Sequence, residues 1–137
     1  MLKELISADE VAKILDRLAF QVAEHCPVNN LYIIGIHRRG VTLAKRLQEV
    51  IAKHHGVELP LGAIDITLYR DDLSEIASFP QVYGTELETS IVGKNVILVD
   101  DVIYTGRTIR AALDCLADFG RPERIMLLAL VDRGHRE

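Results

Sequence analysis

Uninterrupted apolar runs constrain the fold of this chain more than any other feature of its sequence. They occupy residues 31–36, 96–99 and 125–131, with the sequences LYIIGI, VILV and IMLLALV. A run without alternating polar residues is typical of a strand buried on both faces, as in a parallel sheet covered by helices. A further segment at 63–69, AIDITLY, alternates between apolar and polar residues and predicts another strand.

Amphipathic segments lie between these runs and predict the helices that cover the sheet. Apolar residues recur at three- and four-residue spacing from Ser7 to about Glu24, and again after Arg39-Gly40. Residues 107–118 form a third predicted helix. Strands that alternate with helices predict an α/β fold with a doubly wound, mainly parallel sheet and right-handed crossovers. We expect the 137 residues to form a single domain.

Charge and cysteine usage limit the class of protein. Lys and Arg number 16 against 20 Asp and Glu, so any nucleic-acid contact requires a local basic patch. Cys26 and Cys115 lie far apart without metal-ligand spacing, which indicates reduced, half-buried thiols. The first residues lack the apolar core of a secretory signal, and the run at 125–131 is too short to cross a bilayer. We therefore expect a cytoplasmic protein with no membrane partner.

Polar clusters follow each predicted strand directly. They are HRRG at 37–40, RDD at 70–72, DDVIYTGRT at 100–108 and DRGHRE at 132–137. In open α/β sheets, ligands bind beyond the carboxyl ends of the strands, where these clusters would meet. Residues 70–94 show no long periodic segment, and connections of that length are usually binding loops, lids or mobile segments. The sequence therefore predicts an active site at the carboxyl rim of the sheet.

The longest cluster has the chemistry of a phosphate site beside a sugar site. Residues 105–108, TGRT, stand where a loop turns into a helix, and the free N–H groups and dipole of a helix start favour a phosphate monoester. Asp100 and Asp101 precede that loop and are suited to accept hydrogen bonds from sugar hydroxyls. A ribose 5-phosphate satisfies both halves. The alternative is an acid pair that caps the following helix.

The stretch VILVDDVIYTGRT at 96–108 resembles the signature with which type I phosphoribosyltransferases bind phosphoribosyl diphosphate (PRPP). DITLYRDDL, RRG, and GRP followed by LVDRGHRE resemble the PyrR family, whose members regulate the pyrimidine operon and are also uracil phosphoribosyltransferases. The likeness runs from about Leu5 to the last residue. It implies a type I phosphoribosyltransferase-like fold with a flexible flap at 70–84. Because family members continue beyond Glu137, it also implies an incomplete C-terminal hood.

The resemblance implies a role for each polar cluster. Asp100 and Asp101 would hold the ribose hydroxyls, and the diphosphate loop would consist of His37, Arg38, Arg39 and Gly40. We expect Asp101, Arg70 and Arg39 to act in catalysis. The residues implied in PRPP or nucleotide binding are Arg38, Arg39, Gly40, Asp100, Asp101, Val102, Ile103, Tyr104, Thr105, Gly106, Arg107, Thr108 and Ile109.

The base is expected to be uracil. Tyr104 stands where hypoxanthine enzymes carry a carboxylate for the purine N7, which ranks purines below uracil. Asp132, Arg133 and His135 are the implied base-side residues. Three alternatives without a functional role stay open. DRGHRE can be a charged surface end, HRR can be a solvated triplet, and the residues around Arg70 can be a helix cap or a solvated cluster.

The resemblance also implies cofactors and partners. Mg²⁺ is expected with PRPP, with no direct protein ligand and with water-mediated contacts near Asp100 and Asp101. The expected partners are PRPP, uracil, UMP or UTP, and further copies of the chain in a homodimer or larger assembly. Pyrimidine-operon leader RNA is a further candidate partner, with Arg17, Arg121, Arg124 and Arg136 as its candidate contacts, although acidic residues interleave them.

Three functions are compatible with these features. The first is a uracil phosphoribosyltransferase, which makes UMP and diphosphate from uracil and PRPP and also regulates the pyrimidine operon through RNA binding that depends on uridine nucleotides. The second is a nucleotide-sensing RNA-binding attenuation regulator with little catalysis. The third is a type I phosphoribosyltransferase for another base.

Overall fold

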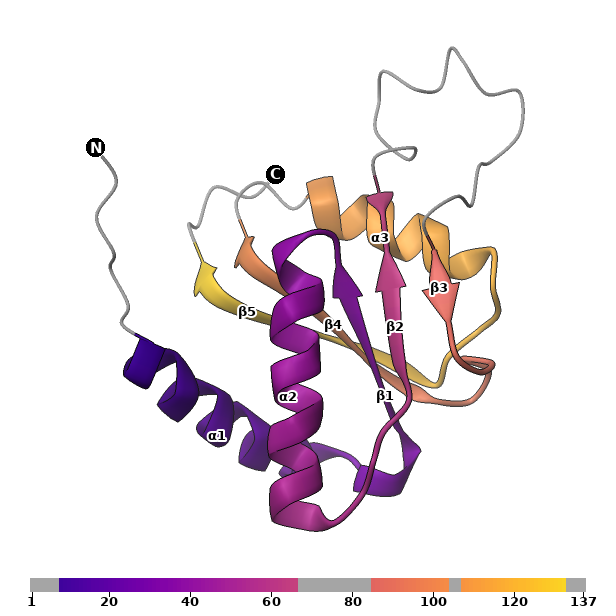
Figure 1. The fold of residues 1–137 in the computed structure, drawn as a ribbon. Helices are drawn as coiled ribbons and strands as arrows, with labels where there is room; N and C mark the ends of the chain where they lie inside the picture. Colours follow the sequence, from indigo (N-terminus) through magenta and orange to yellow (C-terminus); the bar gives the residue numbers. More distant parts are fainter. Residues whose placement is uncertain (1–7, 67–84, 104–106, 133–137) are drawn as a thin grey trace, which may run out of the picture.

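The computed structural model describes residues 8–66, 85–103 and 107–132. Helices and strands alternate along most of the chain, as the apolar pattern predicts (Figure 1). The elements are α1 (Ala8–His25), the short 3-10 helix η1 (Val28–Asn30), β1 (Leu31–Ile36), α2 (Arg39–His55), β2 (Leu61–Ile64), β3 (Glu86–Leu87), β4 (Asn95–Ile103), α3 (Arg107–Ala117) and β5 (Arg124–Asp132).

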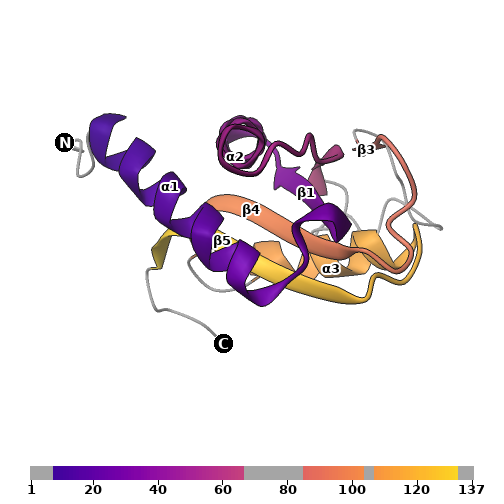
Figure 2. The same ribbon diagram turned by 90° about the horizontal axis from the view of Figure 1, so that it is seen from below.

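The strands form one five-stranded sheet in the order β3-β2-β1-β4-β5. β2, β1, β4 and β5 pair in parallel, and β3 pairs antiparallel with β2. Helices α1 and α2 cover one face of the sheet and α3 covers the other (Figure 2). The predicted doubly wound, mainly parallel α/β sheet is therefore confirmed. Because the four parallel strands point the same way, their carboxyl ends meet at one rim.

Each central strand contributes to two separate cores. In β1, Leu31 and Ile33 pack with α1 and α2, whereas Tyr32 and Ile34 pack with α3. Every residue of β1 is buried, since both of its faces are covered. This explains why the sequence of β1 is apolar without alternation.

The predicted strand at 63–69 is wrong in its bounds. β2 begins at Leu61 and ends at Ile64, and Ile66 lies in a 3-10 turn. The pairing with β1 runs from Ile33↔Leu61 to Ile36↔Ile64, so the ladder stops where β1 stops. Residues 67–69 lie outside the described part of the chain.

Two further features differ from the sequence-based expectation. The segment 70–94 contains β3, a short edge strand that pairs with β2 and carries no periodicity of its own. Cys26 and Cys115 are reduced, as expected, but both are buried instead of half-buried. Among the described helices, none has the length and apolarity required to cross a membrane.

Candidate active site

The carboxyl ends of β1 and β4 bring the two charged clusters together. These strands are paired neighbours, with Gly35 opposite Val99. The segment after β1 supplies His37, Arg38 and Arg39, which are all exposed. At the same level of the sheet, β4 continues into Asp100 and Asp101. The structure thus places the predicted diphosphate loop beside the predicted ribose-binding acids.

The two acids belong to β4 and point to opposite faces of the sheet. In this strand Val96 and Leu98 pack towards α3, while Ile97 and Val99 pack towards α2. Side chains alternate along a strand, so the α3 side receives Asp100 and the α2 side receives Asp101. Adjacent acids in the sequence therefore serve different sides of one rim.

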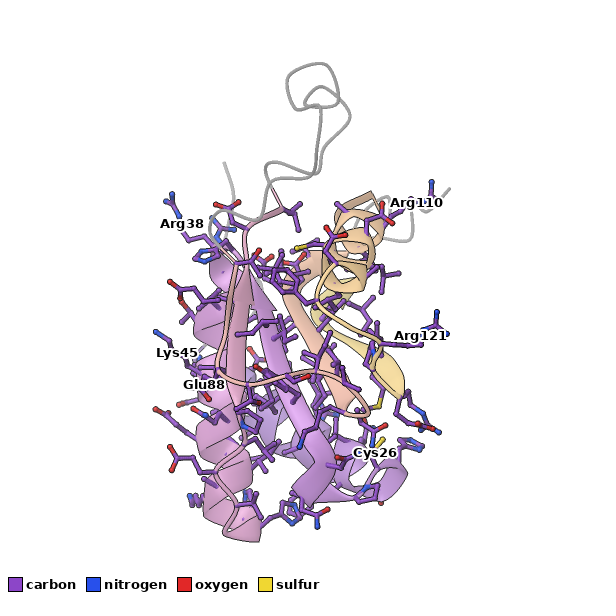
Figure 3. All side chains as sticks on the ribbon, turned by 90° about the vertical axis from the view of Figure 1, so that its right-hand side faces the viewer. Cys26, Arg38, Lys45, Glu88, Arg110 and Arg121 are labelled. Atoms are coloured by element: carbon purple, nitrogen blue, oxygen red, sulfur yellow. The ribbon has the colours of Figure 1, made fainter. Side chains whose placement is uncertain are left out.

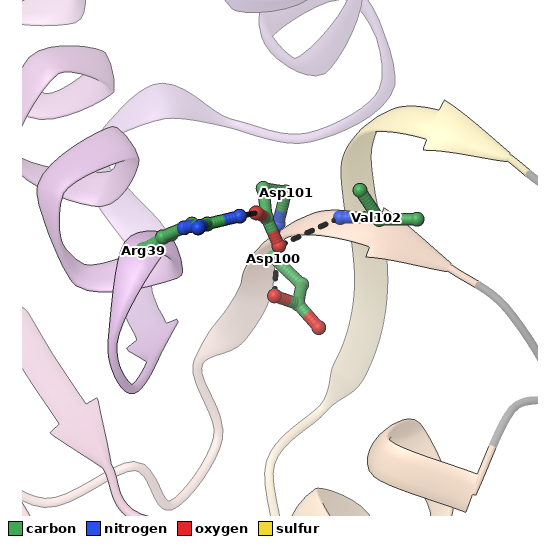
Figure 4. Close-up of polar contacts among 4 residues, drawn as sticks. All are labelled: Arg39, Asp100, Asp101 and Val102. Carbon is green, nitrogen blue, oxygen red and sulfur yellow. Dashed lines mark hydrogen bonds and ion pairs between the residues drawn. The ribbon is translucent and has the colours of Figure 1, made fainter. Parts of the chain in front are cut away.

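Asp101 is held by contacts at both carboxylate oxygens (Figure 4). Arg39 Nη1 donates to Asp101 Oδ2 at 3.3 Å, and the Val102 N–H donates to Asp101 Oδ1 at 2.9 Å. The Arg39 side chain is 83% exposed and the Asp101 side chain 25% exposed. The pair is therefore anchored at its acid end, while the guanidinium end lies in solvent.

Asp100 has a more buried environment. The Asp101 N–H donates to Asp100 Oδ1 at 2.8 Å. The pKa of Asp100 is raised from 3.8 to about 6. Burial is the largest cause, the hydrogen bond and negative charge of the Asp101 side chain also raise this pKa, and the Asp101 backbone N–H lowers it. Part of the Asp100 population is therefore protonated near neutral pH.

The start of α2 is suited to an anion. Its N-cap residue, Arg38, makes no side-chain capping hydrogen bond, and the first turn contains no acid. The first N–H groups of a helix lack intrahelical partners, and the helix dipole favours negative charge there. The peptide bond between His37 and Arg38 is cis.

Gly40 serves the packing of α2 against the sheet. A Cβ at this position would overlap the carbonyl oxygen of Val99 and approach the Cα of Asp100 to 3.2 Å. Gly35 lies equally close, since its Cβ would come within 2.6 Å of the Gly40 carbonyl oxygen. The family resemblance includes Gly40 in the diphosphate loop, and the structure shows that its missing side chain lets α2 begin directly beside the acids.

The remaining nucleotide-binding candidates lie around the start of α3. Val102 is exposed, and Ile103 ends β4. Arg107 and Thr108 open α3 and Ile109 is partly buried against the α3-side core, so a helix does begin where the TGRT pattern predicts one. Tyr104, Thr105 and Gly106 lie outside the described residues, as do Arg70, Arg133, His135 and Arg136.

Arg110 is a rim residue that the sequence prediction did not include. It is exposed on α3, one residue beyond the predicted nucleotide-binding stretch. Figure 3 shows it at the same end of the molecule as Arg38, across the sheet from α2. Its place one helical turn after Arg107 is the signal that could have identified it.

Two of the arginines proposed for RNA, Arg121 and Arg124, lie away from the carboxyl rim. Arg124 opens β5 at the end opposite the carboxyl rim, and its Nη1 donates to Cys26 Sγ at 3.7 Å. Arg121 precedes it and lies well below Arg38 and Arg110 in Figure 3. Arg17 is exposed on α1. Asp132, at the other end of β5, reaches the carboxyl rim. Arg121 and Arg124 therefore do not belong to the rim that carries Asp100 and Asp101.

No cluster of three or more His, Cys, Asp or Glu side chains suited to a metal ion occurs within the described residues. Among the described residues, the rim supplies carboxylate oxygens from Asp100 and Asp101. Mg²⁺ usually keeps several waters and takes one or two carboxylates together with substrate phosphates. The donor set fits a metal that arrives with an anionic substrate.

Comparison with known proteins agrees with this geometry. The family model of the phosphoribosyl transferase domain matches residues 1–137. The chain is 53% identical over 134 residues to the bifunctional protein PyrR of Deinococcus radiodurans, covering 97% of this chain and 73% of that protein. It is 53% identical over 135 residues to the bifunctional protein PyrR of Thermus thermophilus, covering 98% of this chain and 75% of that protein.

Solved structures share the fold. A hypoxanthine phosphoribosyltransferase from Staphylococcus aureus superposes with a TM-score of 0.70 at 20% identity, covering 99% of this chain and 72% of that one. A purine phosphoribosyltransferase from Pyrococcus horikoshii gives a TM-score of 0.69 at 25% identity, with coverage of 93% and 76%. The chain therefore belongs to the phosphoribosyl transferase domain family and, within the type I phosphoribosyltransferases, to the PyrR family.

Proposed function

We propose that the protein transfers the phosphoribosyl group of PRPP to uracil, forming UMP and diphosphate. The observation that carries this proposal is the position of the acid pair Asp100–Asp101 directly beside the start of α2. The first cluster is suited to sugar hydroxyls and the second to a diphosphate. A ligand that carries both groups on one ribose spans them.

The leaving diphosphate is the first target of catalysis. The bond between ribose C1 and the diphosphate oxygen breaks, uracil N1 forms the new bond to C1, and the N1 proton is released. Negative charge grows on the diphosphate as this bond breaks. The uncapped start of α2 and the cationic side chains of Arg38 and Arg39 stabilise that charge more in the transition state than in the ground state.

The ribose is the second target. As the C1–oxygen bond breaks, positive charge develops on the ribose ring, and nearby carboxylates stabilise it. Asp101 lies on the α2 side and Asp100 on the α3 side, so hydroxyls of one ribose can be held from both sides of β4. The 5-phosphate then lies towards the start of α3, where Arg107 and Thr108 begin the helix.

Mg²⁺ is proposed to accompany PRPP. When bound, it would neutralise negative charge on the diphosphate and so assist its departure. Asp100 and Asp101 would hold it through water. Asp101 accepts a hydrogen bond from Val102, which orients its carboxylate for this purpose.

The choice of uracil rests on the PyrR resemblance. The superposed enzymes act on purines, but at 20% and 25% identity they support the fold and not the base. Tyr104 replaces the carboxylate that hypoxanthine enzymes use. Asp132 ends β5 at the same rim and is the proposed base-side residue in the described part of the chain.

A regulatory role through leader RNA is the second candidate function, because the relatives carry the name "bifunctional". Under this candidate, uridine nucleotides bind the rim and Arg17, Arg121 and Arg124 contact RNA away from it. A homodimer or larger assembly would gather such arginines from several copies. Sedimentation and a gel shift against leader RNA across salt concentrations, with and without UMP, test the two parts.

Labelled uracil incubated with PRPP and Mg²⁺ tests the enzymatic proposal. We expect labelled UMP from the wild-type chain and, in a panel of uracil, orotate, hypoxanthine and guanine, turnover of uracil alone. Turnover of a purine alone would identify another base. Retarded RNA without UMP formation would identify a regulator without catalysis.

A further inference from the structure

Two anionic partners compete for Arg39 in the proposed site. It belongs to the predicted diphosphate loop, yet its Nη1 lies 3.3 Å from Oδ2 of Asp101, whose carboxylate the proposed function assigns to the ribose. The other oxygen, Oδ1, already accepts from the Val102 N–H. An unliganded site therefore has its outer sugar-binding oxygen occupied by its own arginine.

The pair is weak enough to be exchanged. Asp101 is held by β4, whereas the Arg39 side chain is 83% exposed and free to swing on the start of α2. Exposed ion pairs change an equilibrium constant by about fivefold at most. A guanidinium can form two parallel hydrogen bonds to phosphate oxygens. A diphosphate also carries more negative charge than one carboxylate does. A diphosphate at the start of α2 is therefore a stronger partner for Arg39 than Asp101 is.

We propose that Arg39, besides contacting the diphosphate, makes the binding of a ribose hydroxyl by Asp101 depend on the presence of a diphosphate. When the diphosphate binds, Arg39 turns to it and frees Asp101 Oδ2 for a ribose hydroxyl. A nucleoside monophosphate lacks the diphosphate, so its hydroxyl competes with Arg39 for the same oxygen. This competition favours the binding of PRPP over that of a monophosphate such as UMP. The inference rests on the function proposed above.

Substitution of Arg39 has opposite effects on the two ligand classes under this proposal. In Arg39→Gln, PRPP loses a cationic contact, so its Kd rises about tenfold or more. UMP and ribose 5-phosphate lose a competitor, so their Kd values fall by up to about fivefold. An arginine that served only as an anion contact would shift all three Kd values upward.

Calorimetric titration of the full chain with PRPP and Mg²⁺, UMP, and ribose 5-phosphate measures these shifts. Arg38→Gln is the matched control: Arg38 is the exposed neighbour, and no ion pair to it occurs among the described residues. We expect this variant to weaken PRPP without strengthening either monophosphate. In an Asp101→Asn background, the further change Arg39→Gln should no longer strengthen UMP, because the contested carboxylate is gone.

The outcomes separate the inference from the function beneath it. Opposite shifts in Arg39→Gln that vanish in the Asp101→Asn background support the proposal. Equal weakening of all ligands, or no change for the monophosphates, overturns it while the proposed function stands. A wild-type chain that binds neither PRPP nor UMP overturns both.

Discussion

The hydroxyl of Tyr32 clamps the backbone of Thr89 through two hydrogen bonds. It donates to the Thr89 carbonyl oxygen at 2.9 Å and accepts from the Thr89 N–H at 3.0 Å. Tyr32 lies in the buried centre of β1, and Thr89 lies in the segment between β3 and β4. One side chain thus ties this edge segment to the middle of the sheet.

Tyr32→Phe is expected to lower the free energy of unfolding by about 1–3 kcal/mol, because both hydrogen bonds are lost and a partly buried backbone pair loses its partner. Denaturant unfolding measures this change. Thr89→Ala is the matched control, since both bonds go to its backbone and survive the substitution. A larger loss in Thr89→Ala than in Tyr32→Phe would contradict the clamp.

Asp100→Asn is expected to stabilise the protein at pH 7.5. The raised pKa means that the folded chain keeps a proton on Asp100 between pH 3.8 and about 6, where the unfolded chain releases it. The stabilisation that comes from this proton is therefore fully present below pH 3.8 and is lost as the pH rises to about 6. Above that pH, the buried charge of Asp100 lowers the free energy of unfolding by a constant amount. Because Asp100 is only partly buried, solvent screening reduces the full equivalent of this shift, and the expected gain in the free energy of unfolding is about 1–2 kcal/mol.

Asparagine removes this cost because it carries no charge, and its side-chain oxygen still accepts from the Asp101 N–H. Unfolding titrations at pH 4.5 and 7.5 should show a smaller fall in stability for Asp100→Asn than for the wild type. Asp114→Asn, an exposed acid on α3, is the control. A variant that is less stable than the wild type at pH 7.5 would show that the buried charge is compensated.

Gly40→Ala is expected to destabilise the fold by about 1–3 kcal/mol, because the added methyl overlaps the Val99 carbonyl oxygen and neither backbone can yield freely. It should also reduce UMP formation by moving α2 away from Asp100. Gly56→Ala is the control: Gly56 has φ of 68° at the end of α2 and open space around it, so its cost of about 1 kcal/mol comes from backbone conformation alone. Thermal unfolding and turnover of the two variants, compared side by side, check the prediction. Equal activity in both would exclude a positioning role for Gly40.

Asp101→Asn is expected to lower kcat/KM for PRPP by about 100-fold or more, because a charged acceptor near the developing ribose cation becomes neutral. The fold should persist, since asparagine still accepts from the Val102 N–H. Glu49→Gln removes an exposed carboxylate on α2 away from the rim and should leave turnover unchanged. Steady-state kinetics with uracil and PRPP measure both. Unaltered kcat/KM in Asp101→Asn would exclude the acid from the reaction.

The local pattern of the sequence was sufficient for the architecture. Apolar runs without alternation, such as LYIIGI, identified the doubly covered strands, because burial on both faces removes polar residues from both. Helical spacing located α3 within one residue, and the polar clusters after the strands located the rim. Family resemblance then supplied the roles of these clusters, which periodicity alone does not provide.

The tertiary structure decided what depends on partners far away in the chain. β2 ends at the residue that pairs with the last residue of β1. The short strand β3 forms by pairing with the outer edge of β2. The contact between Arg39 and Asp101 joins residues 62 positions apart, and it arises because Asp101 faces α2 while Asp100 faces α3. A sequence encodes periodicity within each segment, whereas pairing register and the close approach of α2 at Gly40 exist only once separate segments pack against one another.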